Sequence, residues 1–269
     1  MIPVEPEIRM SSGVPLLKEA IPMLNFDAVV VSDLHLGARN SRGNDFLRFL
    51  HTLRTERLVL NGDLFNDHRL RGLQERDVQV VELLRRYGER VHVDWVVGNH
   101  DPRPEWFAGL LGISAVDEVI LDIGGERYLV YHGHRWDPSL AWPQVVIDTA
   151  DAIYFACQWL DSSHRLARRL KHSSKHFLHV TDVLRRKAIE TALDRALSGV
   201  ILGHSHLACE SRTSGVHYLN SGCWTEKPSS FVGIRDGQAR LYDWDPVARV
   251  AWQRGADAMA SAALAAPTV

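Results

Sequence analysis

The stretch AVVVSDLHLG, residues 28–37, places a β-branched apolar run directly before an aspartate and a histidine. Such a run predicts a buried strand at Ala28–Ser32, with Asp33 and His35 just beyond its carboxyl end. Four further segments repeat this arrangement of polar residues after an apolar run. The five segments are Asp33-Leu34-His35, Gly62-Asp63, Gly98-Asn99-His100-Asp101, His132-Gly133-His134 and Gly203-His204-Ser205-His206. Because ligands gather beyond the carboxyl ends of strands in open α/β sheets, we expect the five segments to converge.

The order of strand and helix patterns predicts the fold class. Amphipathic periodicity predicts helices over Asn44–Arg54 and Asp77–Tyr87, and Gly124-Gly125 between two apolar runs predicts a tight hairpin. The other predicted strands are Leu58–Asn61, Val91–Val97, Val119–Ile123, Arg127–Tyr131, Val200–Leu202, Val216–Leu219, Phe231–Ile234 and Arg240–Asp243. Strand–helix alternation followed by hairpins indicates an α/β protein, a four-layer αββα sandwich of two mixed β-sheets.

Residues 137–196 interrupt this pattern, because they contain no glycine and no strand signal. We predict that they form an inserted helical cap, with an apolar and acidic first part and a basic second part from Arg165 to Lys187. The basic part is either a solvated helix face or a cationic rim, and the apolar part is either core packing or the lining of a groove. The predicted organisation is an irregular lead-in at 1–25, a main domain at 26–250 that carries the cap, and a C-terminal tail at 251–269.

Composition and charge exclude several classes of protein. The 269-residue chain has 45% hydrophobic residues and a net charge of −2, as in ordinary soluble globular proteins. This charge gives no electrostatic reason for nucleic-acid binding, and the sequence holds no nucleic-acid module, so no nucleic-acid partner is expected. Three scattered cysteines without a CxxC pair indicate a reducing compartment. Without a secretory signal or an apolar run of transmembrane length, we expect a cytoplasmic protein, and the cap leaves peripheral contact with the inner membrane open.

The residue types in the five segments indicate a metal site. Nitrogen and oxygen ligands without thiolate suit Mn²⁺, Fe or Zn²⁺, of which we expect Mn²⁺. A carboxylate such as that of Asp63 has two oxygens and can bridge two cations. Two cations about 3.5–4 Å apart can clamp a phosphate and activate a water molecule. Any one of these residues alone would be read as a loop residue, but the ordered set favours two divalent metal ions.

The ordered motifs DxH, GD, GNH, H and GHxH resemble those of the calcineurin-like metallophosphoesterase superfamily, from about Val29 to His206. The resemblance implies hydrolysis of phosphorus ester or anhydride bonds. It implies one metal held by Asp33, His35, Asp63 and His206, and a second held by Asp63, Asn99, His132 and His204. It also implies that His100 donates a proton to the leaving oxygen. In that family an acid near the bridging aspartate often orients this histidine; here Asn66 takes that position, and Asp67 and Asp101 are further candidates.

Within the superfamily, the segments SDLHLG, NGDLF and YLNSGCW and the helical insert resemble the UDP-2,3-diacylglucosamine pyrophosphatases of lipid A synthesis. The GNHD segment resembles a sister group of these enzymes. The implied substrate is a small phosphorylated or lipid-linked nucleotide. A phosphodiesterase, protein phosphatase or nuclease remains an alternative, as does a binding scaffold without catalysis.

Four residues beside the motifs are candidate substrate contacts. Arg39 and Arg103 could grip phosphate through charge-assisted hydrogen bonds. Asn66 and His134 could contact substrate, although His134 is equally well explained as a supporting residue.

Overall fold

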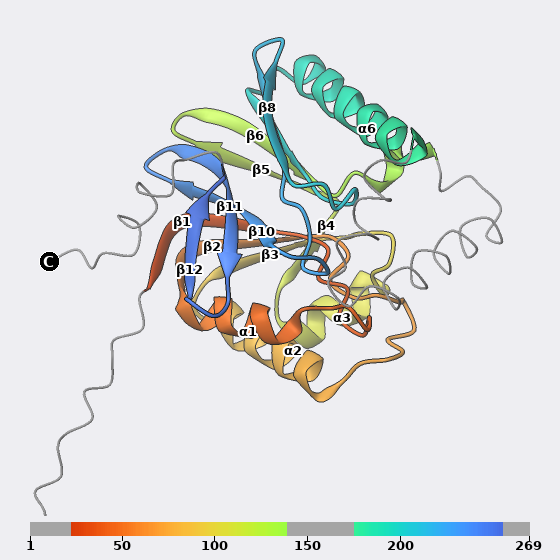
Figure 1. Cartoon of the computed structure of the whole chain (residues 1–269), viewed down its shortest axis with the longest axis vertical. Helices are drawn as coiled ribbons and strands as arrows, with labels where there is room; N and C mark the ends of the chain where they lie inside the picture. Colours follow the sequence, from red (N-terminus) through yellow and green to blue (C-terminus); the bar gives the residue numbers. More distant parts are fainter. Residues whose placement is uncertain (1–22, 139–174, 255–269) are drawn as a thin grey trace, which may run out of the picture.

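The computed structural model describes residues 23–138 and 175–254 and shows two β-sheets that face each other, with helices on both outer sides (Figure 1). The first sheet has the strand order β12-β11-β10-β1-β2-β3-β4, and the second has the order β5-β6-β7-β9-β8. The strands of the first sheet are β1 (Leu24–Val31), β2 (Leu53–Asn61), β3 (His92–Val96), β4 (Ser114–Val116), β10 (Ser229–Arg235), β11 (Gln238–Asp245) and β12 (Val250–Gln253). Those of the second are β5 (Glu118–Ile123), β6 (Glu126–Tyr131), β7 (Gly199–Leu202), β8 (Cys209–Thr213) and β9 (Val216–Asn220).

Three apolar layers hold the sandwich together. The first lies between the first sheet and the helices α1 (Gly43–Thr52), α2 (Glu75–Gly88) and α3 (Pro104–Leu111). The second fills the space between the two sheets, where Val30 and Val59 of the first sheet join Val130 and Ile201 of the second. In β1, Val29 and Val31 face the helices while Val30 faces the other sheet. A strand covered on both faces needs apolar residues at successive positions, which explains the run AVVV.

The third layer joins the second sheet to α6 (Lys175–Asp194), whose residues Leu184 and Ala188 pack with Val200 and Tyr218. Helix α6 therefore forms the outer helical layer of the second sheet (Figure 1). The predicted αββα sandwich is confirmed. The C-terminal part of the predicted cap belongs to this sandwich, and most of the rest falls on residues 139–174, outside the described residues. No helix within the described residues is both long enough and apolar enough to cross a membrane.

Several predicted boundaries differ from the structure. The helix predicted over Asn44–Arg54 spans Gly43–Thr52, because Leu53 and Arg54 begin β2 and pair with Leu24 and Asn25 of β1. Helix α3 and strands β4, β8 and β12 were not predicted. Strand β12 pairs with β11 and continues to Gln253, beyond the expected domain end at residue 250.

The strands that precede the polar motifs run in the same direction. Strand β1 pairs in parallel with β2, β2 with β3, and β6 with β7. Parallel neighbours bring their carboxyl ends to one edge of a sheet. Each sheet thus presents its motif-bearing loops at one end.

The buried carboxylate of Asp77 connects helix α2 to the loop after β1. Its Oδ2 accepts hydrogen bonds from the backbone N–H of Gly37 at 3.2 Å and of Gln74 at 2.9 Å. The second bond completes a capping box at the start of α2. Asp77 therefore holds the Asp33–His35 loop against the helical layer.

We expect Asp77→Ala to lower the free energy of unfolding by about 1–3 kcal/mol, because two partly buried N–H donors lose their buried acceptor. Chemical denaturation followed by circular dichroism measures this change. Glu75→Ala, in the same helical turn but exposed, is the control and should change stability by less than about 0.5 kcal/mol. Equal stability of the two variants would contradict this role of Asp77.

Candidate metal centre

The five polar motifs meet where the carboxyl ends of β1, β2, β3, β6 and β7 come together. The loops after β1 and β2 are bonded to each other, since His35 N–H donates to the Asp63 carbonyl at 2.9 Å and Leu36 N–H to the Leu64 carbonyl at 2.9 Å. The second sheet joins them through the backbone N–H of His204, which donates to Asp33 Oδ2 at 3.0 Å. The predicted convergence of the five segments is therefore observed.

Most of the candidate ligands have an unusual backbone conformation. Asp33, His35, Asp63, His204 and His206 have φ angles of 55°, 46°, 51°, 63° and 58°. Residues other than glycine seldom adopt this left-handed region, and each costs of order 1–3 kcal/mol unless its surroundings impose it. All five residues belong to the candidate site. The surrounding fold therefore imposes on them a backbone conformation that residues with a side chain seldom adopt.

Two motif glycines are required by close approach. A Cβ on Gly62 would lie 2.2 Å from His132 Nδ1, and a Cβ on Gly98 would lie 2.2 Å from Asp63 Oδ1. Each glycine thus leaves room for a candidate ligand from another segment. This explains why glycine precedes Asp63 and Asn99 in the sequence.

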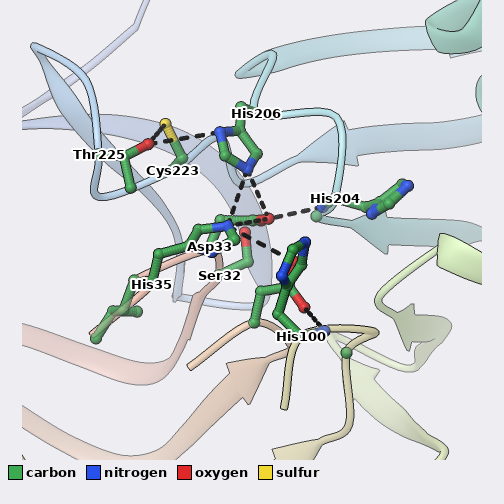
Figure 2. Close-up of polar contacts among 12 residues, drawn as sticks. Ser32, Asp33, His35, His100, His204, His206, Cys223 and Thr225 are labelled. Carbon is green, nitrogen blue, oxygen red and sulfur yellow. Dashed lines mark hydrogen bonds and ion pairs between the residues drawn. The ribbon is translucent and has the colours of Figure 1, made fainter. Parts of the chain in front are cut away.

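Asp33, His35 and His206 form the first cluster of donor atoms (Figure 2). His206 Nε2 lies 3.1 Å from Asp33 Oδ1 and 3.2 Å from His35 Nε2. Their ligand atoms lie within 4.8 Å of one another, close enough to contact a single ion.

Asp63, His132 and His204 form the second cluster. Asp63 Oδ2 lies 3.4 Å from His132 Nε2 and also 3.6 Å from His35 Nε2 of the first cluster. The ring of His132 is fixed by its Nδ1–H, which donates to the Asn61 carbonyl at 2.8 Å. Asp63 therefore lies between the two clusters, as a bridging carboxylate must.

Burial and mutual charge shift the pKa values of these groups. Burial opposes the ionisation of Asp33, but the positive charge of His206 and the close approach of the His206 and His35 rings outweigh it and hold the pKa of this carboxyl well below its usual value. Burial likewise disfavours the charged form of His132, but Asp63 and Asp33 raise its pKa to about 9. The carboxylates thus attract positive charge to this site, and protons and cations compete for the same imidazole nitrogens.

Buried polar atoms that lack a hydrogen-bond partner indicate whether these residues fit metal ions. Asp33 Oδ1, Asn99 Oδ1 and His132 Nε2 are buried and have no hydrogen-bond partner among the described residues. Buried polar atoms are nearly always satisfied, so three such atoms at one site call for a missing partner. Oxygen and imidazole donors suit divalent cations such as Mn²⁺, Fe²⁺ or Zn²⁺. The residues therefore fit two divalent ions and do not by themselves select one element.

The side chain of His100 is exposed, and its ring lies 5.1 Å from that of His35. Its Nδ1–H donates to the backbone carbonyl of Asn66 at 3.0 Å, which leaves Nε2 available for a proton. Desolvation of its ring by the surrounding protein lowers the pKa of His100. Asn66 thus contributes its backbone oxygen to the orientation of His100. Asp67, the neighbouring candidate, is engaged by Arg71 and by the N–H of Arg69.

Asp101, one of the candidates for orienting His100, makes its hydrogen bonds to other groups. Its Oδ2 accepts from the N–H groups of Asp63 at 3.0 Å and Gly98 at 2.8 Å and from Trp95 Nε1 at 3.1 Å. Its Oδ1 accepts from Phe65 N–H at 3.1 Å. Burial and the Asp63 carboxylate raise the pKa of Asp101 to about 6. The carboxylate holds the β2 and β3 loops together instead of facing the reaction site.

The candidate substrate residues fall into two groups. Arg39 and Arg103 are exposed at loop positions next to the motifs. His134 is half-buried, stacks on Tyr131 with ring centroids 6.2 Å apart, and lies 5.5 Å from the His132 ring. Burial and the nearby His132 and His204 lower the pKa of His134 to about 4.

Sequence reasoning missed the residues that support the ligands from outside. Asp137 Oδ2 lies 2.7 Å from His204 Nε2, and Thr225 Oγ1 lies 3.5 Å from His206 Nδ1 (Figure 2 shows Thr225). Neither residue stands in one of the five motifs. Asp137 follows His134 by three residues. This proximity in sequence indicates a supporting role only when the position of the His204 ring is known.

Searches against known proteins gave distant relatives. The chain is 20% identical to the DNA polymerase II small subunit of Methanothermobacter thermautotrophicus over 248 residues, which cover 78% of this chain and 49% of that protein. The chain thus spans about half the length of this curated relative.

Solved structures of similar fold include Yfce, a phosphoesterase from E. coli, with 17% identity and a TM-score of 0.47, covering 86% of this chain and 99% of that one. They also include wild-type Vps29 from Entamoeba histolytica complexed with Zn²⁺, with 16% identity and a TM-score of 0.46, covering 84% and 96%. TM-scores below 0.5 assign no function.

The family assignment comes from a direct match to a family profile. The profile described as "Calcineurin-like phosphoesterase superfamily domain" matches residues 26–234, which include all five motifs. The predicted resemblance at the superfamily level is confirmed, and this chain belongs to the calcineurin-like phosphoesterase superfamily.

Proposed function

We propose that this protein is a dinuclear metal-dependent hydrolase of phosphorus ester or anhydride bonds. The observation that carries the proposal is the pair of donor clusters, Asp33-His35-His206 and Asp63-His132-His204, with the Asp63 carboxylate within 3.6 Å of a histidine of each. Asn99 Oδ1 is buried and has no hydrogen-bond partner within the described part of the chain, which supports it as a further donor for the second cluster.

The proposed centre combines a bound cofactor with the chain's own groups. Two bound divalent ions would supply neutralisation of phosphate charge and acidification of a water molecule. Asp33, Asp63 and the surrounding imidazoles hold the negative charge and the lone pairs that such ions require. Asp33, Asp63 and His132 are almost fully buried, which limits their contact with bulk water.

The chain's own proton donor in this proposal is His100. Its Nδ1–H is committed to the Asn66 carbonyl, so Nε2 is the atom that holds and donates a proton to the leaving oxygen. Its exposed side chain supports this role, since a substrate could reach it from solvent.

For the substrate, we propose a nucleotide- or lipid-linked phosphoanhydride of the UDP-2,3-diacylglucosamine type. Support comes from the sequence segments SDLHLG, NGDLF and YLNSGCW, which resemble those of lipid A pyrophosphatases. A cytoplasmic protein with peripheral membrane contact would meet such a substrate. The alternative is a phosphodiesterase, phosphatase or nuclease, and the similarity to a DNA polymerase subunit adds single-stranded DNA to the substrates worth testing.

Loss of a bridging or terminal ligand tests the metal proposal. We expect Asp63→Asn and His204→Ala to abolish phosphodiester hydrolysis and to reduce the bound metal below two ions per chain, because each removes a donor. Elemental analysis after Mn²⁺ loading measures the metal content. Exposed His51→Ala is the control and should keep both activity and metal. A chelator should inactivate the wild-type protein, and Mn²⁺ should restore it; full activity in either ligand variant would refute the proposal.

The two neighbours His100 and Asp101 should differ in their effects. We expect His100→Ala to lower kcat by about 10²–10⁴-fold with unchanged stability, as for loss of a general acid. Asp101→Ala should instead lower the free energy of unfolding by about 1–3 kcal/mol or more, because four buried donors lose one acceptor group. Steady-state kinetics and urea denaturation of both variants distinguish these roles. Unchanged turnover in His100→Ala would remove it from the mechanism.

A substrate panel tests the finer assignment. We expect the Mn²⁺-loaded protein to hydrolyse UDP-2,3-diacylglucosamine with the highest kcat/KM among four compounds, the others being a cyclic nucleotide, a phosphopeptide and single-stranded DNA. Phosphate or nucleotide release is followed by chromatography. A higher kcat/KM for any of the other three would replace this substrate while leaving the reaction class in place.

A further inference from the structure

Asp137 makes the shortest polar contact to any candidate ligand side chain among the described residues. Its Oδ2 lies 2.7 Å from His204 Nε2, and the two side chains are only 8% and 10% exposed. A carboxylate accepts and an imidazole N–H donates, so this distance describes a charge-assisted hydrogen bond from Nε2–H to Asp137.

The backbone holds Asp137 in position for this contact. Asp137 directly follows the 3-10 helix η1 (His134–Trp136), and its N–H donates to the His134 carbonyl at 3.0 Å. The turn begins at the motif that supplies His132. The same loop therefore provides one candidate ligand, His132, and the acceptor for another, His204.

The bond determines which nitrogen of His204 is available. With Nε2–H committed to Asp137, Nδ1 is the nitrogen of His204 that keeps a lone pair for a cation at the Asp63-His132-His204 cluster. The negative charge of Asp137 also makes the imidazole a better donor. Both histidines of this cluster then have an acceptor behind the ring, because His132 Nδ1–H donates to the Asn61 carbonyl. In the other cluster, His35 Nδ1 is buried and has no hydrogen-bond partner among residues 23–138 and 175–254.

We propose that Asp137 is a positioning residue, which acts through His204 to fix its tautomer and orientation and so strengthens cation binding at the Asp63-Asn99-His132-His204 site. This inference rests on the proposed function, since it needs that site to bind a cation. It extends the His132-Gly133-His134 segment to a residue outside the five motifs, and it makes the two cation sites unequal.

Titration of metal-free protein with Mn²⁺ tests the proposal without any substrate. The free ion is followed by electron paramagnetic resonance, and the heat of binding by calorimetry. We expect wild type to bind two ions. Asp137→Ala should weaken one of the two by roughly 10–100-fold, the usual effect of losing a partner behind a ligand, and leave the other unchanged. Asp137→Asn, which keeps a neutral acceptor, should fall between Asp137→Ala and wild type.

A matched control is an exposed aspartate that pairs with Arg135, two residues before Asp137. Asp117 Oδ1 accepts from Arg135 Nη2 at 3.0 Å, but this pair is exposed, so Asp117→Asn should bind both ions as wild type does. Thermal melting of the metal-free variants checks that they fold, and Asp137→Asn decides the question if Asp137→Ala does not. Wild-type affinity at both sites in Asp137→Asn and in any folded Asp137→Ala would overturn the proposal. Failure of wild type to bind two ions would instead overturn the proposed function, and this inference with it.

Discussion

The buried Asp63 carboxylate is the group around which this end of the sandwich is arranged. One oxygen, Oδ1, accepts the His100 N–H at 3.0 Å, and the other faces His132 and His35. A buried charge without compensation is strongly unfavourable. The surrounding histidines, the N–H groups and the absence of a Cβ at Gly98 all follow from the need to accommodate that charge.

The sandwich supplies the geometry that this charge requires. Asp33, Asp63 and Asn99 follow strands of the first sheet, whereas His132 and His204 follow strands of the second. The apolar layer between the sheets, with Val30 and Val59 against Val130 and Ile201, sets the separation of these two groups. Asp77 holds the loop after β1 and Asp101 holds the loop after β2. Buried carboxylates outside the two donor clusters therefore fix the loops that carry the candidate ligands.

Much of this arrangement was predictable from sequence, because the strands before the ligands are continuous apolar runs and the ligands follow them directly. The αββα class and the convergence of five motifs followed from that pattern. Elements without a periodic apolar signal were missed. Strand β8, with the sequence CESRT, is mostly polar and is defined by its pairing with β9. The C-terminal part of α6 has an amphipathic pattern that says nothing about whether it covers a site or a sheet, and only its contacts with Val200 and Tyr218 decide this.

The supporting contacts could not be predicted for a different reason. The role of Asp101 depends on the directions of four N–H groups, and the orientation of His100 depends on a backbone carbonyl, which any residue at position 66 would provide. Asn66 was identified for its side chain, but its backbone is what contacts His100. Such contacts depend on the path of the backbone. The residue types in the sequence therefore do not predict them.

The left-handed backbone at Asp33, His35, Asp63, His204 and His206 has an evolutionary consequence. Glycine adopts this conformation without steric penalty. In a lineage released from selection for hydrolysis, glycine at any of these positions would relieve strain while removing a ligand. Drift toward a sturdier but inert descendant would then be thermodynamically downhill, an instance of the general conflict between stability and activity. This chain retains all five side chains, although glycine at these positions would make the fold more stable.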